Sequence, residues 1–140
     1  MKRSICFFLL AALILGLAGC GSQVRIDYGT SSLYTKADMD AAIQVIRQRF
    51  DAWEEGCELH SIRYVSDENS NEENLNWMNE LGAAQGIEQS FTQCILFESS
   101  FHSPRRNAGA WNPNQEYTGW GWWLARTEDG PWQLMTCGYG

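Results

Sequence analysis

Positive charge is scarce in this sequence. Its 140 residues include ten Lys and Arg against 17 Asp and Glu, which gives a net charge of −7 at pH 7. Such an acidic surface repels the phosphates of nucleic acids and the head groups of anionic lipids. We therefore expect no nucleic-acid partner and no electrostatic docking to a membrane.

Recognisable catalytic and metal-binding motifs are also missing. The sequence has no C-x-x-C pair, no H-E-x-x-H, no G-x-S-x-G elbow and no glycine-rich phosphate loop. The only histidines, His60 and His102, lie on different predicted elements without a spacing typical of metal ligands. We therefore predict no catalytic residue, no metal and no cofactor, and a structural or surface role for both histidines.

The one long hydrophobic run lies at the N-terminus. Two basic residues, Lys2 and Arg3, precede the uncharged apolar stretch 5–15. This stretch is shorter than the roughly 20 residues of a membrane-spanning helix. The run closes on Leu17–Cys20, where small residues precede a cysteine. This N-terminus resembles the bacterial prolipoprotein signal.

The resemblance implies that residues 1–19 form a signal peptide and that Cys20 becomes the lipid-bearing N-terminus. Roughly two or three acyl chains, palmitate among them, bury enough CH₂ groups at about 0.8 kcal/mol each to hold the protein permanently. Cleavage leaves eight basic and 17 acidic residues, a net charge of −9. We therefore expect lipid, not surface charge, to hold the chain on the extracytoplasmic face of the cell membrane.

Two parts follow the signal peptide. Residues 20–34, rich in Gly and Ser, are predicted to be a lipidated tether, and residues 35–140 a single α+β domain. Thr35 and Asp38 form a capping box that opens a long helix ending at Gly56. The helical period shows in its apolar stripe, which consists of Met39, Ala42, Ile43, Ile46, Phe50 and Trp53.

The rest of the domain is mainly β. Runs of β-branched and aromatic residues predict strands at 57–65, 91–99, 117–126 and 132–139. Ser70 and Glu73 form a second capping box, which opens a shorter helix ending before Gly82, and 101–116 is predicted to be a long loop. This order predicts an α+β fold in which a long N-terminal helix packs on a curved, mostly antiparallel sheet.

Three cysteines remain in the mature chain besides the lipidated one: Cys57, Cys94 and Cys137. An odd number permits at most one internal disulfide. Cys57 opens one predicted strand and Cys94 lies inside another, so we predict a disulfide between these two. The alternative is that all three are small buried hydrophobic side chains.

Several segments resemble a known group of proteins. They are the lipobox, the capped helix leading to Gly56–His60, the run Phe101–Pro104, the stretch Trp120–Arg126 and the final Trp-x-Leu…Gly-Tyr. These segments are similar to small uncharacterised lipoproteins of low-GC Gram-positive bacteria, which implies an NTF2-like or cystatin-like roll. Similar segments are fused to membrane metallopeptidases of the antirepressor class. Their H-E-x-x-H is absent here, so the resemblance implies no peptidase activity.

Tryptophan marks the candidate binding site. In the strand 117–126, a period of two places Trp120 and Trp122 on one face and Trp123 on the other. A small roll buries only one aromatic face completely, so we predict a concave pocket or an exposed aromatic platform for a sugar or an apolar ligand. Its candidate residues are Trp53, His60, Trp120, Trp122, Arg126 and Tyr139. The alternative is a core on one face and a covering helix on the other.

These features together predict a membrane-tethered extracytoplasmic lipoprotein that binds or senses a small molecule or envelope ligand. Two alternatives stay open. One is a small NTF2-like enzyme in which His60 and a carboxylate converge in a cavity. The other is a protein-interaction module that regulates a membrane protein partner.

Overall fold

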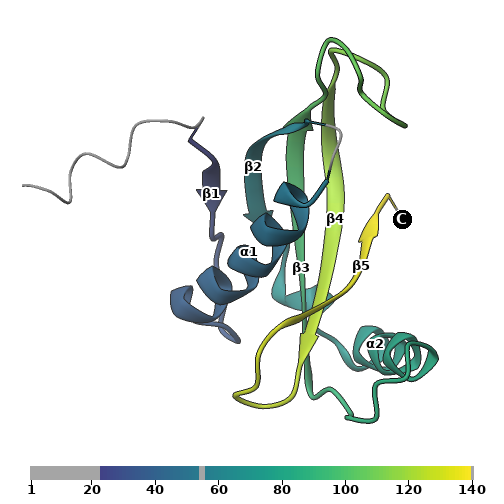
Figure 1. Cartoon of the computed structure of the whole chain (residues 1–140). Coiled ribbons are helices and arrows are strands. Elements are labelled where there is room, and N and C mark those ends of the chain that lie inside the picture. The colour runs from purple at the N-terminus through teal and green to yellow at the C-terminus, as the bar shows by residue number, and fades with distance from the viewer. Residues whose placement is uncertain (1–22, 54–55, 140) are drawn as a thin grey trace, which may run out of the picture.

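The computed structural model describes residues 23–53 and 56–139 (Figure 1). In this part of the chain, two α-helices and a five-stranded open mixed sheet confirm the predicted α+β class. The predicted signal peptide and Cys20 lie outside it, and none of its helices is long and apolar enough to cross a membrane. The elements are β1 (Arg25–Asp27), α1 (Lys36–Asp51), β2 (Glu58–Tyr64), the 3₁₀ turn η1 (Asp67–Asn69), α2 (Glu72–Ala84), β3 (Gln93–His102), β4 (Glu116–Arg126) and β5 (Gln133–Gly138).

The sheet has the strand order β1-β2-β3-β4-β5. β1 runs parallel to β2, with Ile26 opposite Ile62, while β2 to β5 pair antiparallel. β1 is absent from the prediction, which treats 20–34 as a tether. Its three residues are too few to show an alternating pattern, and only pairing with β2 makes them a strand. Part of the predicted tether therefore belongs to the sheet.

Asp67 holds the segment that joins β1 to α1. Its carboxylate accepts hydrogen bonds from Ser31 Oγ at 2.5 Å and from the backbone nitrogen of Ser32 at 2.7 Å. The Tyr64 hydroxyl donates to the same carboxylate at 2.5 Å. These bonds, that from Ser31 first, lower the pKa of Asp67. Ser31 and Ser32 are therefore fixed to the domain by a charged acceptor.

The predicted start of α1 is confirmed. Thr35 Oγ1 accepts from the Asp38 nitrogen at 3.1 Å, and Asp38 Oδ2 accepts from the Thr35 nitrogen at 2.8 Å. The helix ends at Asp51 with Ala52 as C-cap, earlier than the predicted end at Gly56. The apolar period continues past the helix because Trp53 packs against Phe50 after the last turn. Trp53 is therefore apolar because it packs on Phe50, and not because it belongs to the helix.

The second helix differs from the prediction at both ends. Asn71, not Ser70, is the N-cap of α2, with its Oδ1 accepting from the Asn74 nitrogen at 2.8 Å. Ser70 instead donates to the Cys94 carbonyl at 2.6 Å, a partner that only the tertiary structure supplies. Gly82 lies inside α2, where a Cβ would be 3.0 Å from the Phe91 ring. This glycine permits close packing and does not end the helix.

A helix packs on each face of the sheet (Figure 1). α1 lies across one face, and its stripe packs on a core that includes Ile62, Phe97, Trp122 and Leu124. α2 covers one end of the other face, where the buried residues are Met78, Phe91, Cys94, Ala125 and Met135. Trp123 packs on this second core and Trp120 on the first, as the period of two predicts. The part of the second face that α2 leaves uncovered is the outer face described below.

The predicted disulfide between Cys57 and Cys94 is wrong. Glu58, next to Cys57, pairs with His102 at one end of β3, whereas Cys94 lies eight residues away near the other end. Eight residues of strand span about 26 Å, and a disulfide needs Cα atoms within about 7 Å. Cys94 is a free thiol, and burial raises its pKa to about 11. The sequence does not show the register of β2 against β3, so it does not show which end of β3 lies beside Cys57.

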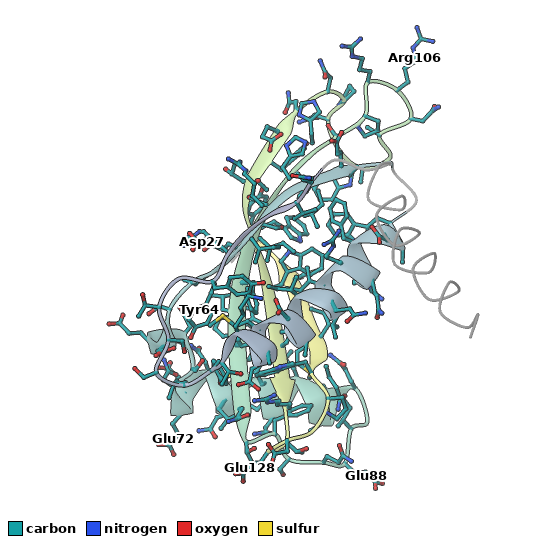
Figure 2. The ribbon with its side chains drawn as sticks, turned by 90° about the vertical axis from the view of Figure 1, so that its left-hand side faces the viewer. Asp27, Tyr64, Glu72, Glu88, Arg106 and Glu128 are labelled. Carbon is teal, nitrogen blue, oxygen red and sulfur yellow. The ribbon has the colours of Figure 1, made fainter. Side chains whose placement is uncertain are left out.

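The long loop is shorter than predicted, because β3 continues to His102 and β4 begins at Glu116. Ser103 is buried at its base, where its Oγ accepts from the Gln115 nitrogen at 3.0 Å. Figure 2 shows Arg106 at the tip of this loop and Glu72, Glu88 and Glu128 at the opposite end of the molecule. The long axis of the domain therefore runs from a basic tip to an acidic end.

Candidate functional site

Four of the six predicted ligand-binding residues meet near the C-terminal end of α1. Trp53 stacks on Trp122 with ring centroids 5.6 Å apart and 23° between the planes. Trp53 also contacts Trp120 edge-on at 5.9 Å, and Trp120 contacts Tyr139 at 5.0 Å. Trp122 is 0% exposed, and its Nε1 donates to Ser99 Oγ at 2.8 Å. Trp122 is therefore a core residue that no ligand reaches.

Arg126 lies at the other end of β4 and does not join this cluster. Its Nε donates to Gln93 Oε1 at 2.6 Å and its Nη2 to Asp38 Oδ1 at 3.1 Å. The guanidinium also lies 4.2 Å from the centroid of the Trp132 ring, a cation–π contact. Hydrogen bonding to the Thr35 backbone, with help from Arg126, lowers the pKa of Asp38. The contacts of Arg126 thus join β4 to the N-terminus of α1.

His60 lies apart from the other candidates, in a surface cluster with His102. Glu116 bridges the two rings: Oε1 lies 3.0 Å from His60 Nδ1 and Oε2 lies 3.1 Å from His102 Nδ1. The rings stack at 6.0 Å, and both side chains are about one-third exposed. Within 23–53 and 56–139, no group of three or more His, Cys, Asp or Glu side chains could hold a metal ion. The histidines converge on a carboxylate at the surface and line none of the clefts described below.

Hydrogen bonds with Asn114 and with Glu116 raise the pKa of His102 above its ordinary value. A raised pKa means that the folded protein stabilises the protonated form of the His102 ring. This stabilisation is fully present below the ordinary pKa of histidine and is lost as the pH rises through the raised pKa. We expect Glu116→Gln to lower the pKa of His102, measured by NMR titration of the ring protons. The control, Glu128→Gln at the opposite end of the molecule, should leave it unchanged. Titration of wild-type His102 at its ordinary value would contradict this prediction.

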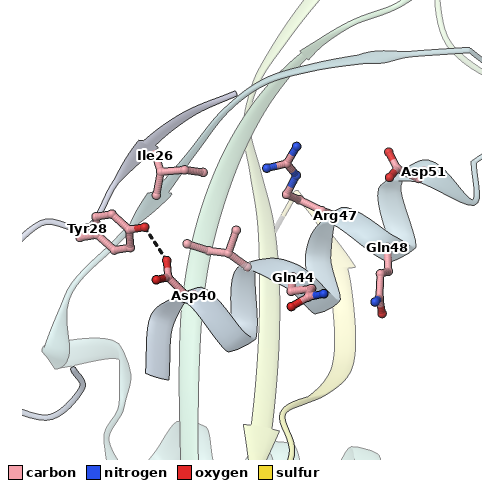
Figure 3. A pocket seen from close by; sticks show the side chains of 8 residues that line it. Ile26, Tyr28, Asp40, Gln44, Arg47, Gln48 and Asp51 are labelled. Atoms are coloured by element: carbon pink, nitrogen blue, oxygen red, sulfur yellow. Dashed lines mark hydrogen bonds between the residues drawn. The ribbon is translucent and has the colours of Figure 1, made fainter. Parts of the chain in front are cut away.

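Two clefts flank α1. Figure 3 shows the first, about 450 Å³ between β1 and the solvent side of the helix, where the Tyr28 hydroxyl donates to Asp40. Arg47 and Asp51 also line it. The second, about 760 Å³, separates α1 from β5 and is lined by residues such as Arg49 and Leu134. Both clefts present side chains of a helix surface, and neither joins several aromatic rings.

A third cleft, of about 390 Å³, lies on the outer face of the sheet beside α2, and we name it the aromatic cleft. Its volume falls in the range of about 300–1,000 Å³ that is typical of small-molecule sites. Two neighbouring cross-strand rungs line it, one of Leu96, Trp123 and Thr136 and one of Glu98, Gly121 and Gly138. Asn69, Trp77, Gly119, Cys137 and Tyr139 complete the lining.

One exposed and one half-buried indole form a corner of the aromatic cleft. Trp77 of α2 is 38% exposed and meets Trp123 of β4 edge-to-face, with centroids 5.4 Å apart and 78° between the planes. Tyr139, 59% exposed, lines the cleft beyond β5, while its ring contacts Trp120, which packs on the first core. Exposed large aromatic side chains gathered in one concavity are a mark of binding sites. Of the predicted candidates, Tyr139 alone lines this cleft.

Trp77 and Trp123 are absent from the predicted binding residues, although the sequence contains a signal for each. Trp77 stands off the apolar stripe of its helix, which Leu75, Met78 and Leu81 form, so a helical period places it toward solvent. The period of two places Trp123 on the face opposite Trp122. Nothing in the sequence shows that these two tryptophans meet, because α2 and β4 are far apart in the chain.

We compared the chain with known proteins. No family model, no curated protein and no solved structure matches the chain.

Proposed function

We propose that this chain is a membrane-tethered extracytoplasmic lipoprotein whose domain binds a small ligand. The motif Leu17–Cys20 and the apolar run before it support the proposed location at the membrane. The aromatic cleft is the observation that carries the binding role, because it joins the exposed Trp77 indole and the half-buried Trp123 indole with polar side chains in one concavity of suitable size. The proposed site therefore differs from the predicted pocket, whose Trp122 is buried.

We also propose that the domain is an NTF2-like or cystatin-like roll. An NTF2-like or cystatin-like roll would place a helix against the concave face of a mostly antiparallel sheet. Packing of α1 on the face formed by β2 to β5, which pair antiparallel, supports this assignment. Because α1 fills that face with apolar side chains, we assign the binding role to the opposite face.

Thermal unfolding with candidate ligands tests the binding role. A ligand present at about 100 times its Kd stabilises a protein by about 2.7 kcal/mol. In a panel of envelope glycans, lipids and β-lactams, we expect at least one compound to raise the Tm of the wild-type chain. Trp77→Ala should abolish that shift, whereas Leu33→Ala, which removes an exposed side chain outside the cleft, should keep it. Absence of a shift with every compound would contradict the proposal.

A further inference from the structure

We propose that the aromatic cleft binds the ring of a neutral saccharide. This inference rests on the proposed function and adds the class of ligand. Three properties of the cleft carry it: a corner of aromatic rings, a floor without side chains, and polar groups that carry no net charge.

The corner is formed by two indoles. Because Trp77 and Trp123 stand at 78° to each other, they present surfaces in two directions. A pyranose ring has one face of C–H groups, which packs on an aromatic surface, and a rim of hydroxyl groups. Trp77 is held by its contact with Trp123 and keeps 38% of its surface exposed, so its area is available with little loss of side-chain freedom.

The floor is formed by glycines. A Cβ on Gly121 would lie 3.2 Å from the Gly138 carbonyl oxygen, so a side chain there would crowd the backbone of β5. At Gly119 and Gly138 the position of a Cβ has no atom within 4 Å, and both have positive φ values, which favour glycine. The bare backbone lets a ring approach the sheet closely, and it leaves open space at the two outer glycines.

The polar groups form a neutral set. Arg63 Nη2 donates to Glu98 Oε2 at 2.6 Å, which balances the charge of the carboxylate, while Oε1 accepts from no described residue. Asn69 and Thr136 also line the cleft, and no described residue hydrogen-bonds to either side chain. These donors and acceptors suit hydroxyl groups. The balanced charge of Glu98 favours a neutral ligand over a quaternary ammonium, because a paired carboxylate adds little to the attraction of the rings for a cation.

NMR titration of the full chain tests the inference. The probes are maltose, cellobiose and N,N′-diacetylchitobiose, with choline and indole as cationic and apolar alternatives. We expect a disaccharide to shift the indole N–H signals of Trp77 and Trp123 and to leave that of the buried Trp122 in place. Trp77→Ala and Glu98→Gln should each weaken binding by about tenfold or more, and Leu33→Ala should not. Co-sedimentation with purified cell-wall glycan shows whether the saccharide source is the envelope or a free sugar.

The outcomes separate the two proposals. If choline or indole shifts the cleft signals and no saccharide does, the saccharide inference is wrong and the binding role stands. The saccharide inference is equally wrong if a disaccharide binds with the same affinity to the wild type and to both cleft variants. If no probe moves the cleft signals and the ligand panel gives no thermal shift, both proposals fail.

Discussion

Trp122→Ala is expected to lower the free energy of unfolding by about 3–5 kcal/mol, the usual cost of truncating a fully buried aromatic side chain. Trp122 is 0% exposed and stacks on Trp53, so its loss leaves a cavity between the sheet and α1. The substitution also removes the indole N–H that donates to Ser99, itself buried at 3% exposure. Urea unfolding followed by circular dichroism measures the change.

The matched control is Trp77→Ala, which deletes the same side chain from a site that is 38% exposed. This change should cost less, about 1–2 kcal/mol, because the ring is partly exposed and its loss removes mainly the contact with Trp123. Trp122→Phe should fall between the two variants, because it keeps an aromatic ring and loses the hydrogen bond to Ser99. If Trp122→Ala were as stable as the wild type but lost ligand-induced stabilisation, Trp122 would line a pocket and our description of the core would be wrong.

Cys20→Ala is expected to abolish lipid attachment, because the thiol of this residue is the proposed acceptor of the diacylglyceryl group, whose acyl chains enter the membrane. The chain should then incorporate no labelled palmitate, while the domain stays folded, since Cys20 precedes every described element. The acidic balance of the sequence offers the membrane no electrostatic attraction. Metabolic labelling and membrane fractionation after a high-salt wash measure the effect.

Cys6→Ala is the matched control, because it replaces a cysteine within the apolar run and leaves Leu17–Cys20 intact. This variant should label with palmitate and fractionate with membranes as the wild type does. Membrane association of Cys20→Ala that survives the salt wash would show a second anchor and would contradict lipid on Cys20 as the sole attachment.

Local sequence signals predicted most of the secondary structure. The capping box of Thr35 and Asp38, the stripe of α1 and the alternation in β4 depend on residues within a few positions of each other. The errors arise where a distant partner decides. Ser70 is a good N-cap by itself but binds the Cys94 carbonyl, and β1 becomes a strand only beside β2.

The sequence predicted part of the candidate site, and distant contacts again decided the rest. The sequence shows that Trp120 and Trp122 share a face and that Trp123 has the opposite one, which the two cores confirm. It does not show which face a helix fills completely. Burial of Trp122 under α1 removes it from the site, and α2 brings Trp77 to Trp123.

The sequence by itself determined the α+β class, the start of α1, the four longer strands and the acidic surface, because composition and short-range periodicity specify these properties. The tertiary structure alone decided the sheet register, which separates Cys57 from Cys94, and the partners of His60 and Arg126. It also decided that Trp77 meets Trp123 on the outer face of the sheet. Contacts between residues far apart in the chain depend on how whole elements pack, and no short segment of sequence encodes that arrangement.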